Sequence, residues 1–253
     1  MAKPPRPKAV ALRVELLEVA PLIWRRVLVP DHWTFASLHH YLQWVMGWTQ
    51  SHAHEFEIGD GLVAPDWWIQ EAGSGEESAR YRDDRRVSVA AVVSQLGLRG
   101  DFLYRYDMGD GWEHRIVIES RPASTLSNPR LPVCIAGEHA CPPEDVGGPH
   151  GYAMFLEILA DRDHEQHEDT MRWIGGVFDP KGFDLNRLNR DWKGASRKRR
   201  GNLGAAQRAG AVRSGVPRVP RHAALPRCYC MTGKANLAAS ICHPAGDCVR
   251  GQP

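Results

Sequence analysis

Long apolar runs and cysteines are scarce in this 253-residue sequence. No run of about 18 apolar residues occurs, so no membrane-spanning helix is predicted. The Pro- and Lys-rich start, residues 1–8, is not followed by the apolar segment of a secretory signal, which favours a cytoplasmic protein. Only Cys134 and Cys141 of the six cysteines precede residue 193, so a disulfide framework is not expected.

Three sequence motifs of common enzyme classes are also missing. The sequence contains no GxxxxGK[ST] loop, no GxGxxG after an expected strand and no GxSxG elbow. Their absence argues against an NTPase, a dinucleotide-dependent oxidoreductase and an α/β-hydrolase.

The composition changes character near residue 193. Residues 1–192 hold all nine Trp and carry 20 Lys and Arg against 29 Asp and Glu, a net charge of −9. Residues 193–253 carry 12 basic residues and one acidic residue, a net charge of +11. We therefore predict an ordered domain over residues 9–192, a disordered start over 1–8 and a disordered basic tail over 193–253. The charge of the tail suits weak, non-specific binding to nucleic acid, whereas an acidic domain does not.

Apolar periodicity predicts a domain in which strands come first and helices later. Alternating side chains predict strands over residues 9–19, 23–29 and 52–58. Thr34 and Gly47 are the expected N-cap and C-terminal end of a helix between the last two of these strands. Later helices are expected over residues 87–96, 152–159, 165–174 and 183–189, whereas 60–86 and 121–150 are predicted to be loops.

The most specific local signal is a β-hairpin. Two alternating runs, residues 102–106 and 112–118, flank the turn Met108-Gly109-Asp110-Gly111. Together with the early strands and late helices, it predicts an α+β fold: a single domain with an antiparallel or mixed β-sheet packed by helices, rather than repeated βαβ units.

Four segments in this order resemble one known family. They are Ile23-Trp24-Arg25-Arg26 with Pro30, the segment from Leu38-His39 to Glu55-Phe56, Tyr104 to His114, and Cys134 to Tyr152. Their order and spacing resemble the plasmid pRiA4b ORF-3-like family over residues 9–192. The resemblance implies a single α+β domain of bacteria and archaea, often carried on mobile elements as a transposon passenger, and it assigns no activity.

A group of polar residues suggests a metal or acid–base site. His52 and His54 are two residues apart on an expected strand, so both rings are expected to point to one side. Asp107 and Asp110 flank the hairpin turn, and His114 follows it. Zinc or another first-row divalent metal suits three imidazoles and two carboxylates, with His52, His54 and His114 as the proposed ligands. The alternative is that Asp107 and Asp110 only build the turn and the histidines lie half-buried in the core.

Basic and aromatic residues form a second candidate group. They are Trp24, Arg25, Arg26, Trp48 and Trp112. Arginine beside tryptophan can stack on bases or bind phosphate, but it can equally pair with the carboxylates of an acidic domain, which we favour. Cys134 and Cys141 are too far apart in sequence for a zinc finger, and the adjacent Glu144 and Asp145 need not face one site, so a structural loop is expected there.

Two functions from different classes remain open. The first is a non-catalytic binding or accessory module of a mobile element, without a cofactor and with a protein or nucleic acid as partner. The second is a metal-dependent hydrolase or nuclease that uses the His and Asp residues, with Asp107 or Asp110 as ligand or base.

Overall fold

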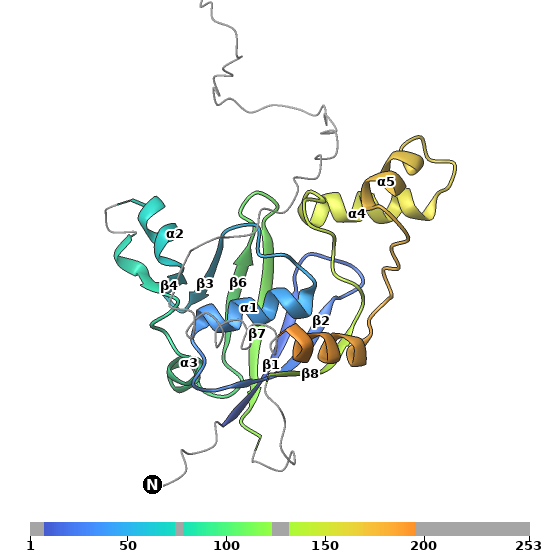
Figure 1. The fold of residues 1–253 in the computed structure, drawn as a ribbon. Helices are drawn as coiled ribbons and strands as arrows, with labels where there is room; N and C mark the ends of the chain where they lie inside the picture. Colours follow the sequence, from blue (N-terminus) through green and yellow to red (C-terminus); the bar gives the residue numbers. More distant parts are fainter. Residues whose placement is uncertain (1–7, 74–77, 123–131, 196–253) are drawn as a thin grey trace, which may run out of the picture. The chain divides into compact units, whose positions relative to one another are not determined.

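Buried and partly buried residues alternate in parts of the first two strands, which belong to a single mixed β-sheet. The computed structural model describes residues 8–73, 78–122 and 132–195. Its strands are β1 (Ala9–Leu16), β2 (Trp24–Pro30), β3 (His54–Ile58), β4 (Gly61–Ala64), β5 (Tyr81–Asp83), β6 (Asp101–Tyr106), β7 (Trp112–Ser120) and β8 (Val133–Glu138). They lie in the order β5-β4-β3-β6-β7-β1-β2-β8 (Figure 1). Only the β4–β5 pair is parallel, so the sheet is mixed.

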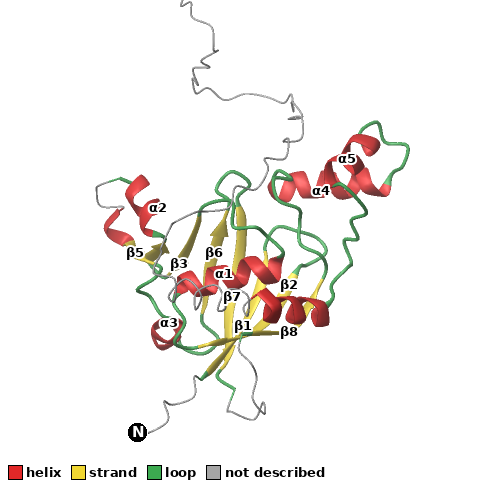
Figure 2. Ribbon diagram, in the orientation of Figure 1, coloured by secondary structure: helices red, strands yellow, loops and turns green. Residues whose placement is uncertain are grey.

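Three helices are inserted between the strands, and the others follow the last strand. They are α1 (Phe35–Met46), α2 (Asp66–Glu71), α3 (Val89–Leu96), α4 (Gly148–Ala160) and α5 (His167–Ile174), with a short 3-10 turn at Ser78–Arg80 and a last helix over 185–195. Helix α1 lies across the sheet with the last helix beside it (Figure 2). Trp192 of the last helix packs edge-on against Tyr41 and Trp44 of α1. None of the helices in the described ranges is long and apolar enough to cross a membrane.

The two faces of the sheet differ in chemistry because side chains alternate along each strand. Phe56 and Phe102 face α1 and contact its Phe35. The opposite face carries paired charges, among them Arg105, which contacts Glu55, Glu57 and Glu113 of neighbouring strands. The core therefore lies between the sheet and α1, and the far face is polar.

The α+β class, the hairpin and the expected helix ends are confirmed. The Thr34 side chain accepts a hydrogen bond from the Ser37 amide at the start of α1, and Gly47 ends the helix with φ +89°. The hairpin joins β6 and β7 with Tyr106 opposite Trp112.

Two segments predicted as loops contain regular structure. Residues 60–86 hold β4, α2 and β5, and residues 121–150 hold β8. Both were missed because these strands are short and lie near the edges of the sheet, so only their pairing partners stabilise them. The strand predicted from residue 52 begins only at His54, which leaves His52 in the preceding loop.

The domain limits are described in part. The last helix continues to residue 195, three residues beyond the predicted domain end. Residues 1–7 and 196–253, which hold most of the two segments predicted to be disordered, lie outside the described residues.

Candidate metal centre

Arg25 fastens the C-terminal end of α1 to the sheet. It is buried on β2, and its Nε donates to the carbonyl oxygen of Val45 at 3.0 Å. Its Nη atoms donate to the carbonyl oxygens of Trp24, Glu138 and His139 at 2.7–2.8 Å. Because the last carbonyls of a helix carry partial negative charge, the cation complements the end of α1, which has no basic residue in its last turn.

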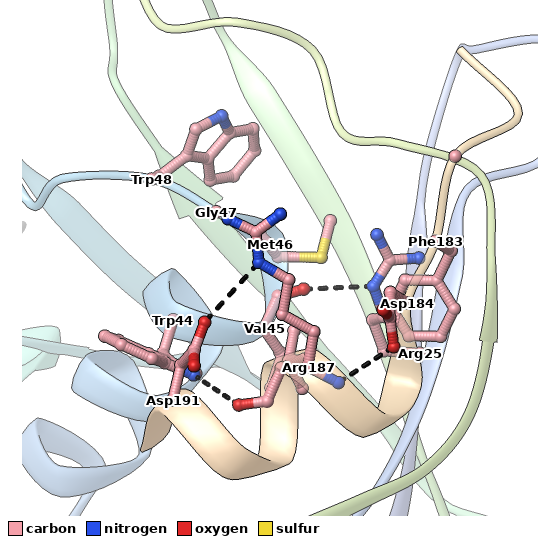
Figure 3. A pocket seen from close by; sticks show the side chains of 12 residues that line it. Arg25, Trp44, Val45, Met46, Gly47, Trp48, Phe183, Asp184, Arg187 and Asp191 are labelled. Carbon is pink, nitrogen blue, oxygen red and sulfur yellow. Dashed lines mark hydrogen bonds and ion pairs between the residues drawn. The ribbon is translucent and has the colours of Figure 1, made fainter. Parts of the chain in front are cut away.

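A groove of about 580 Å³ opens beside this arginine, between the end of α1 and the last helix (Figure 3). Trp44, Trp48 and Phe183 form aromatic walls, and the Phe183 ring lies 4.1 Å from the Arg25 guanidinium carbon. Each guanidinium nitrogen of Arg25 donates to a carbonyl oxygen of the protein, and Nη2 also lies 3.4 Å from the Cys141 sulfur. Arg25 is therefore a structural cross-link rather than a phosphate-binding residue.

The loop after α1 is held by side chains of the core. The amide of Gln50 donates to Oε1 of Gln43 on α1, at 2.9 Å. The amide of Ser51 donates to the hydroxyl of Tyr106 on β6, at 3.1 Å. These two contacts lie directly before His52, so the core sets where this histidine lies.

The hairpin turn supplies the next member of the site. Asp107 has φ +56°, and its Oδ1 accepts hydrogen bonds from the amides of Gly109 and Asp110. The turn-building role expected of Asp107 is thus confirmed. Its second oxygen, Oδ2, lies 3.5 Å from Nε2 of His52, so the same carboxylate also faces the loop after α1.

The loop between β8 and α4 completes the group. Glu144 accepts hydrogen bonds from the amide and hydroxyl of Thr49 at 2.7 and 3.0 Å, and from the Tyr106 hydroxyl at 3.0 Å. Burial first and the charge of Glu144 second raise the pKa of Tyr106 well above its ordinary value, so its hydroxyl keeps the proton it donates. The amide of Gly147 donates to Oδ2 of Asp110, which docks this loop on the hairpin turn.

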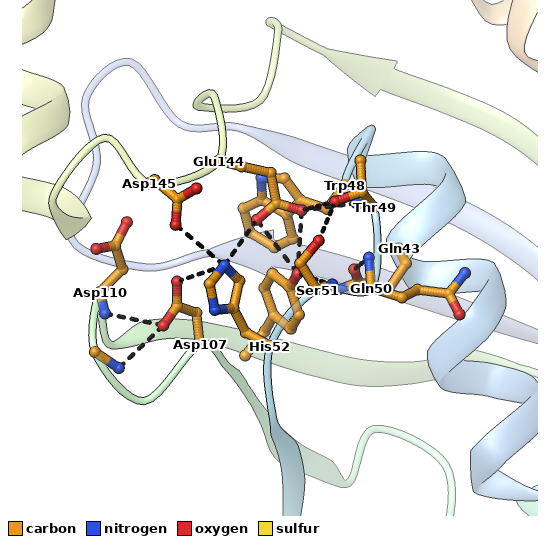
Figure 4. Close-up of polar contacts among 12 residues, drawn as sticks. Gln43, Trp48, Thr49, Gln50, Ser51, His52, Asp107, Asp110, Glu144 and Asp145 are labelled. Carbon is orange, nitrogen blue, oxygen red and sulfur yellow. Dashed lines mark hydrogen bonds and ion pairs between the residues drawn. The ribbon is translucent and has the colours of Figure 1, made fainter. Parts of the chain in front are cut away.

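His52 lies at the centre of these three loops (Figure 4). Its Nε2 is 3.1 Å from Asp145 Oδ1, 3.5 Å from Asp107 Oδ2 and 3.9 Å from Glu144 Oε2. This nitrogen is shielded from solvent and has no hydrogen bond of good geometry. Ligand atoms of His52, Asp107 and Asp145 all lie within 4.8 Å of one another, which makes them a candidate metal-binding group in the described part of the chain.

The other two proposed histidine ligands have different neighbours. His54 is buried, stacks on His39 of α1 with ring centroids 3.5 Å apart, and places Nε2 3.2 Å from the buried Asp84. His39 in turn contacts the Tyr104 hydroxyl at 2.8 Å, and burial followed by the neighbouring His54 lowers the pKa of His39 to about 2. His54 belongs to a polar network between β3 and α1.

His114 lies inside the core. It is fully buried, its Nδ1 lies 3.1 Å from the carbonyl oxygen of Tyr104, and the Trp48 ring meets it edge-on. Burial lowers the pKa of His114 to about 4. His52, His54 and His114 therefore do not form a candidate ligand group among the described residues, whereas His52 and Asp107 do come together.

The remaining candidates have structural surroundings. Trp112 is buried and packs against Trp48. Arg26 makes a two-pronged ion pair with Glu119 at 2.7 and 2.8 Å, the carboxylate pairing that we favoured for it. Burial raises the pKa of the Cys134 and Cys141 thiols to about 11, so neither is a reactive thiolate.

Sequence reasoning missed the contribution of Glu144 and Asp145. Adjacent residues in a loop were not expected to face one site, but a φ of +59° at Asp145 turns the chain so that both carboxylates approach His52. The only available signal was the acidic pair itself inside a Pro- and Gly-rich loop.

One family model and two known proteins match this chain. The model of the plasmid pRiA4b ORF-3-like protein family matches residues 8–187. The chain is 43% identical over 184 residues to uncharacterized protein y4hQ of Sinorhizobium fredii, which covers 72% of this chain and 89% of that protein. The crystal structure of a protein of unknown function, MM3350 from Methanosarcina mazei, is similar with a TM-score of 0.61 and 31% identity, covering 72% of this chain and 98% of that one.

Proposed function

The chain belongs to the plasmid pRiA4b ORF-3-like family, and for this member we propose a divalent-metal-dependent hydrolase whose ion is held by His52, Asp107 and Asp145. The observation that carries the proposal is the position of His52 Nε2. This nitrogen is shielded from water, lacks a hydrogen-bond partner and has three carboxylates within 4 Å. A divalent ion would satisfy the nitrogen and offset two of the three negative charges at once.

The distances support a shared ion. Two atoms bonded to one ion at about 2.1 Å are at most about 4.2 Å apart. The contacts of His52 with Asp107 and Asp145, 3.5 and 3.1 Å, already lie within that limit. One imidazole with two carboxylates suits zinc, manganese or iron better than calcium, which prefers oxygen ligands alone.

The number of ligands supports catalysis. Structural zinc sites have four protein ligands, whereas catalytic sites have three and leave a position for water or substrate. A metal ion in such a site lowers the pKa of bound water, which makes a nucleophile available near neutral pH. Asp145 is 55% exposed at its side chain, so the centre is reachable from solvent.

Titration of the purified chain with Zn²⁺, Mn²⁺ and Co²⁺ tests the proposal. We expect one ion per chain, and His52→Gln to weaken binding by at least about tenfold because it removes a ligand. Asp110→Asn is the matched control, since Asp110 lies in the same turn but bonds the Gly147 amide instead. Equal affinities for the parent and His52→Gln would refute the metal centre.

A metal-dependent activity is the second requirement. Chromogenic ester, amide and phosphodiester substrates should be screened with and without the ion, and with the His52→Gln protein as the blank. Turnover that survives removal of the ion would refute metal-dependent hydrolysis.

An accessory binding module of a plasmid or transposon is the second candidate function. The net charge of −9 over residues 1–192 favours it, because an acidic surface suits a basic protein partner better than bare nucleic acid. A partner recovered by pull-down from a native host, together with an absence of metal binding, would favour this candidate over the hydrolase.

A further inference from the structure

The carboxylates around His52 outnumber the charge of a single divalent ion. Asp107, Glu144 and Asp145 each place an oxygen within 4 Å of His52 Nε2. Three negative charges beside one doubly positive ion leave the occupied centre with a net charge of about −1, since the bound imidazole is neutral. Two of the carboxylates are the proposed ligands, so Glu144 carries the excess charge.

Glu144 is held in place independently of any ion. The Thr49 amide and hydroxyl and the Tyr106 hydroxyl all donate to its Oε1. These three donors fix the position of Oε1 in Glu144. Its Oε2 also accepts from Tyr106, at 3.2 Å, and lies 3.9 Å from His52 Nε2.

Ion pairs with arginine or lysine do not offset this charge in the described part of the chain. In the ranges that the structure describes, no arginine or lysine makes an ion pair with Asp107, Asp110, Glu144 or Asp145. Arg25, on the β2 strand behind the loops, donates to carbonyl oxygens and to Cys141. Sites that bind phosphate usually present arginine, lysine or a helix N-terminus to it. The N-terminus of α4 does lie beside this group, but its Gly147 amide donates to Oδ2 of Asp110.

From this charge balance, and resting on the proposed metal centre, we infer that Glu144 is a specificity-determining residue that excludes phosphate-like anions from the open positions of the ion. The substrate group that reaches the ion is then uncharged or cationic, such as an amide carbonyl, and not a phosphodiester. The hydrolase is therefore not a nuclease.

Cobalt-loaded full-length protein provides the test, because ligands that bind Co²⁺ change its visible absorption. The probes are imidazole, which is uncharged, and inorganic phosphate. We expect imidazole to bind at least about tenfold more tightly than phosphate in the parent. Glu144→Gln, which keeps the hydrogen-bond acceptor but removes the charge, should tighten phosphate binding by about three- to tenfold and leave imidazole within about twofold.

Glu168→Gln is the control for net charge, because Glu168 is exposed on α5 and away from the loops of the site. It should change neither affinity. Phosphate that binds the parent as tightly as imidazole, or a ratio of affinities that Glu144→Gln leaves unchanged, would overturn the inference. Failure of both probes to bind would also overturn it, since no open position would exist. A chain that binds no Co²⁺ fails at the first step and refutes the proposed function itself.

Discussion

Arg25 and Arg26 are adjacent on β2 and point to opposite faces of the sheet. The first is therefore buried, whereas the second is partly exposed. Arg25 is 2% exposed and donates to the backbone carbonyls of Val45, Glu138 and His139. Arg26 lies on the polar face and pairs with Glu119. The first arginine holds the fold together around the site, whereas the second contributes a surface ion pair of small value.

This difference predicts unequal effects of the same substitution. Arg25→Lys should destabilise the fold by about 2–3 kcal/mol, because a lysine ammonium cannot reproduce the planar fork of donors and leaves buried carbonyls without partners. Arg26→Lys should cost less than about 1 kcal/mol. Urea unfolding of both variants measures the difference, and equal losses would show that Arg25 is not the cross-link described above.

His114 makes the stability of the fold depend on pH. Burial lowers the pKa of folded His114 to about 4, whereas an unfolded histidine titrates near 6.5. Below about pH 6.5 the unfolded chain therefore binds a proton that the folded chain does not. Stability from this group is complete above pH 6.5 and is lost as pH falls toward 4, by about 2 kcal/mol between pH 7.5 and 5.

The measurement is urea unfolding of the parent and of His114→Gln across this range. Because glutamine does not titrate, the variant should start less stable at pH 7.5 but lose about 2 kcal/mol less on acidification. Parallel stability curves for the two proteins would show that His114 is not the group responsible.

The turn between β6 and β7 packs closely against the start of α4. A Cβ on Gly148 would lie 2.2 Å from the carbonyl oxygen of Asp110, and Gly148 has φ +70°. Gly111 has nearly the same φ, +69°, but a Cβ there would meet nothing within 4 Å. Gly148 therefore allows close approach of α4 and the hairpin turn, whereas Gly111 only permits the positive φ of the turn.

Substitution of alanine at these two positions distinguishes the cost of a positive φ from the cost of a steric clash. Gly111→Ala should cost about 1–2 kcal/mol, the penalty for a left-handed backbone alone. Gly148→Ala should cost more than about 3 kcal/mol and also weaken metal binding, because it pushes the hairpin turn away from the loop that carries Asp145. Thermal unfolding and metal titration of both variants check this, and a Gly148→Ala protein with parental metal affinity would contradict it.

At the scale of the whole molecule, the last helix joins α1 to the edge of the sheet. The side-chain amide of Asn189 donates to and accepts from the backbone of Cys134 on β8, at 2.8 and 3.0 Å. Trp192 packs on α1 three residues later, 4.9 Å from the Tyr41 ring. Edge strands need such protection because their free backbone groups invite pairing with other chains.

Shortening the chain tests where the folded domain ends. A chain that stops after residue 195 should melt within about 2 °C of the full length, whereas one that stops after residue 184 should melt more than about 8 °C lower, because it loses Asn189 and Trp192. Differential scanning calorimetry of the two shortened chains gives both values. A large loss from the first truncation would mean that residues 196–253 stabilise the domain.

Much of the fold was predictable because its signals are local. The hairpin, the Thr34 cap and the Gly47 end each depend on residues within a few positions of one another, so the sequence alone contains the pattern. Short edge strands such as β5 and β8 have no such pattern, since three to six residues show too little periodicity to be distinguished from a loop.

The candidate site was predictable only in part. His52 and Asp107 were singled out by residue type, but spacing wrongly suggested that His52 shares a strand with His54. Asp145 joins them through a loop whose position depends on the docking of Gly147 and Gly148 against Asp110. No spacing rule in the sequence connects residues that are so far apart.

The α+β class, the family, the main hairpin and the change of net charge near residue 193 could all be read from the sequence. Each of these depends on composition or on neighbours along the chain. Which polar residues meet depends on the tertiary structure, because the strand order places three loops from distant parts of the sequence together around His52. Burial then separated the candidates, since His114 and Arg25 lie inside the fold, whereas the side chains of His52 and Asp145 are partly exposed.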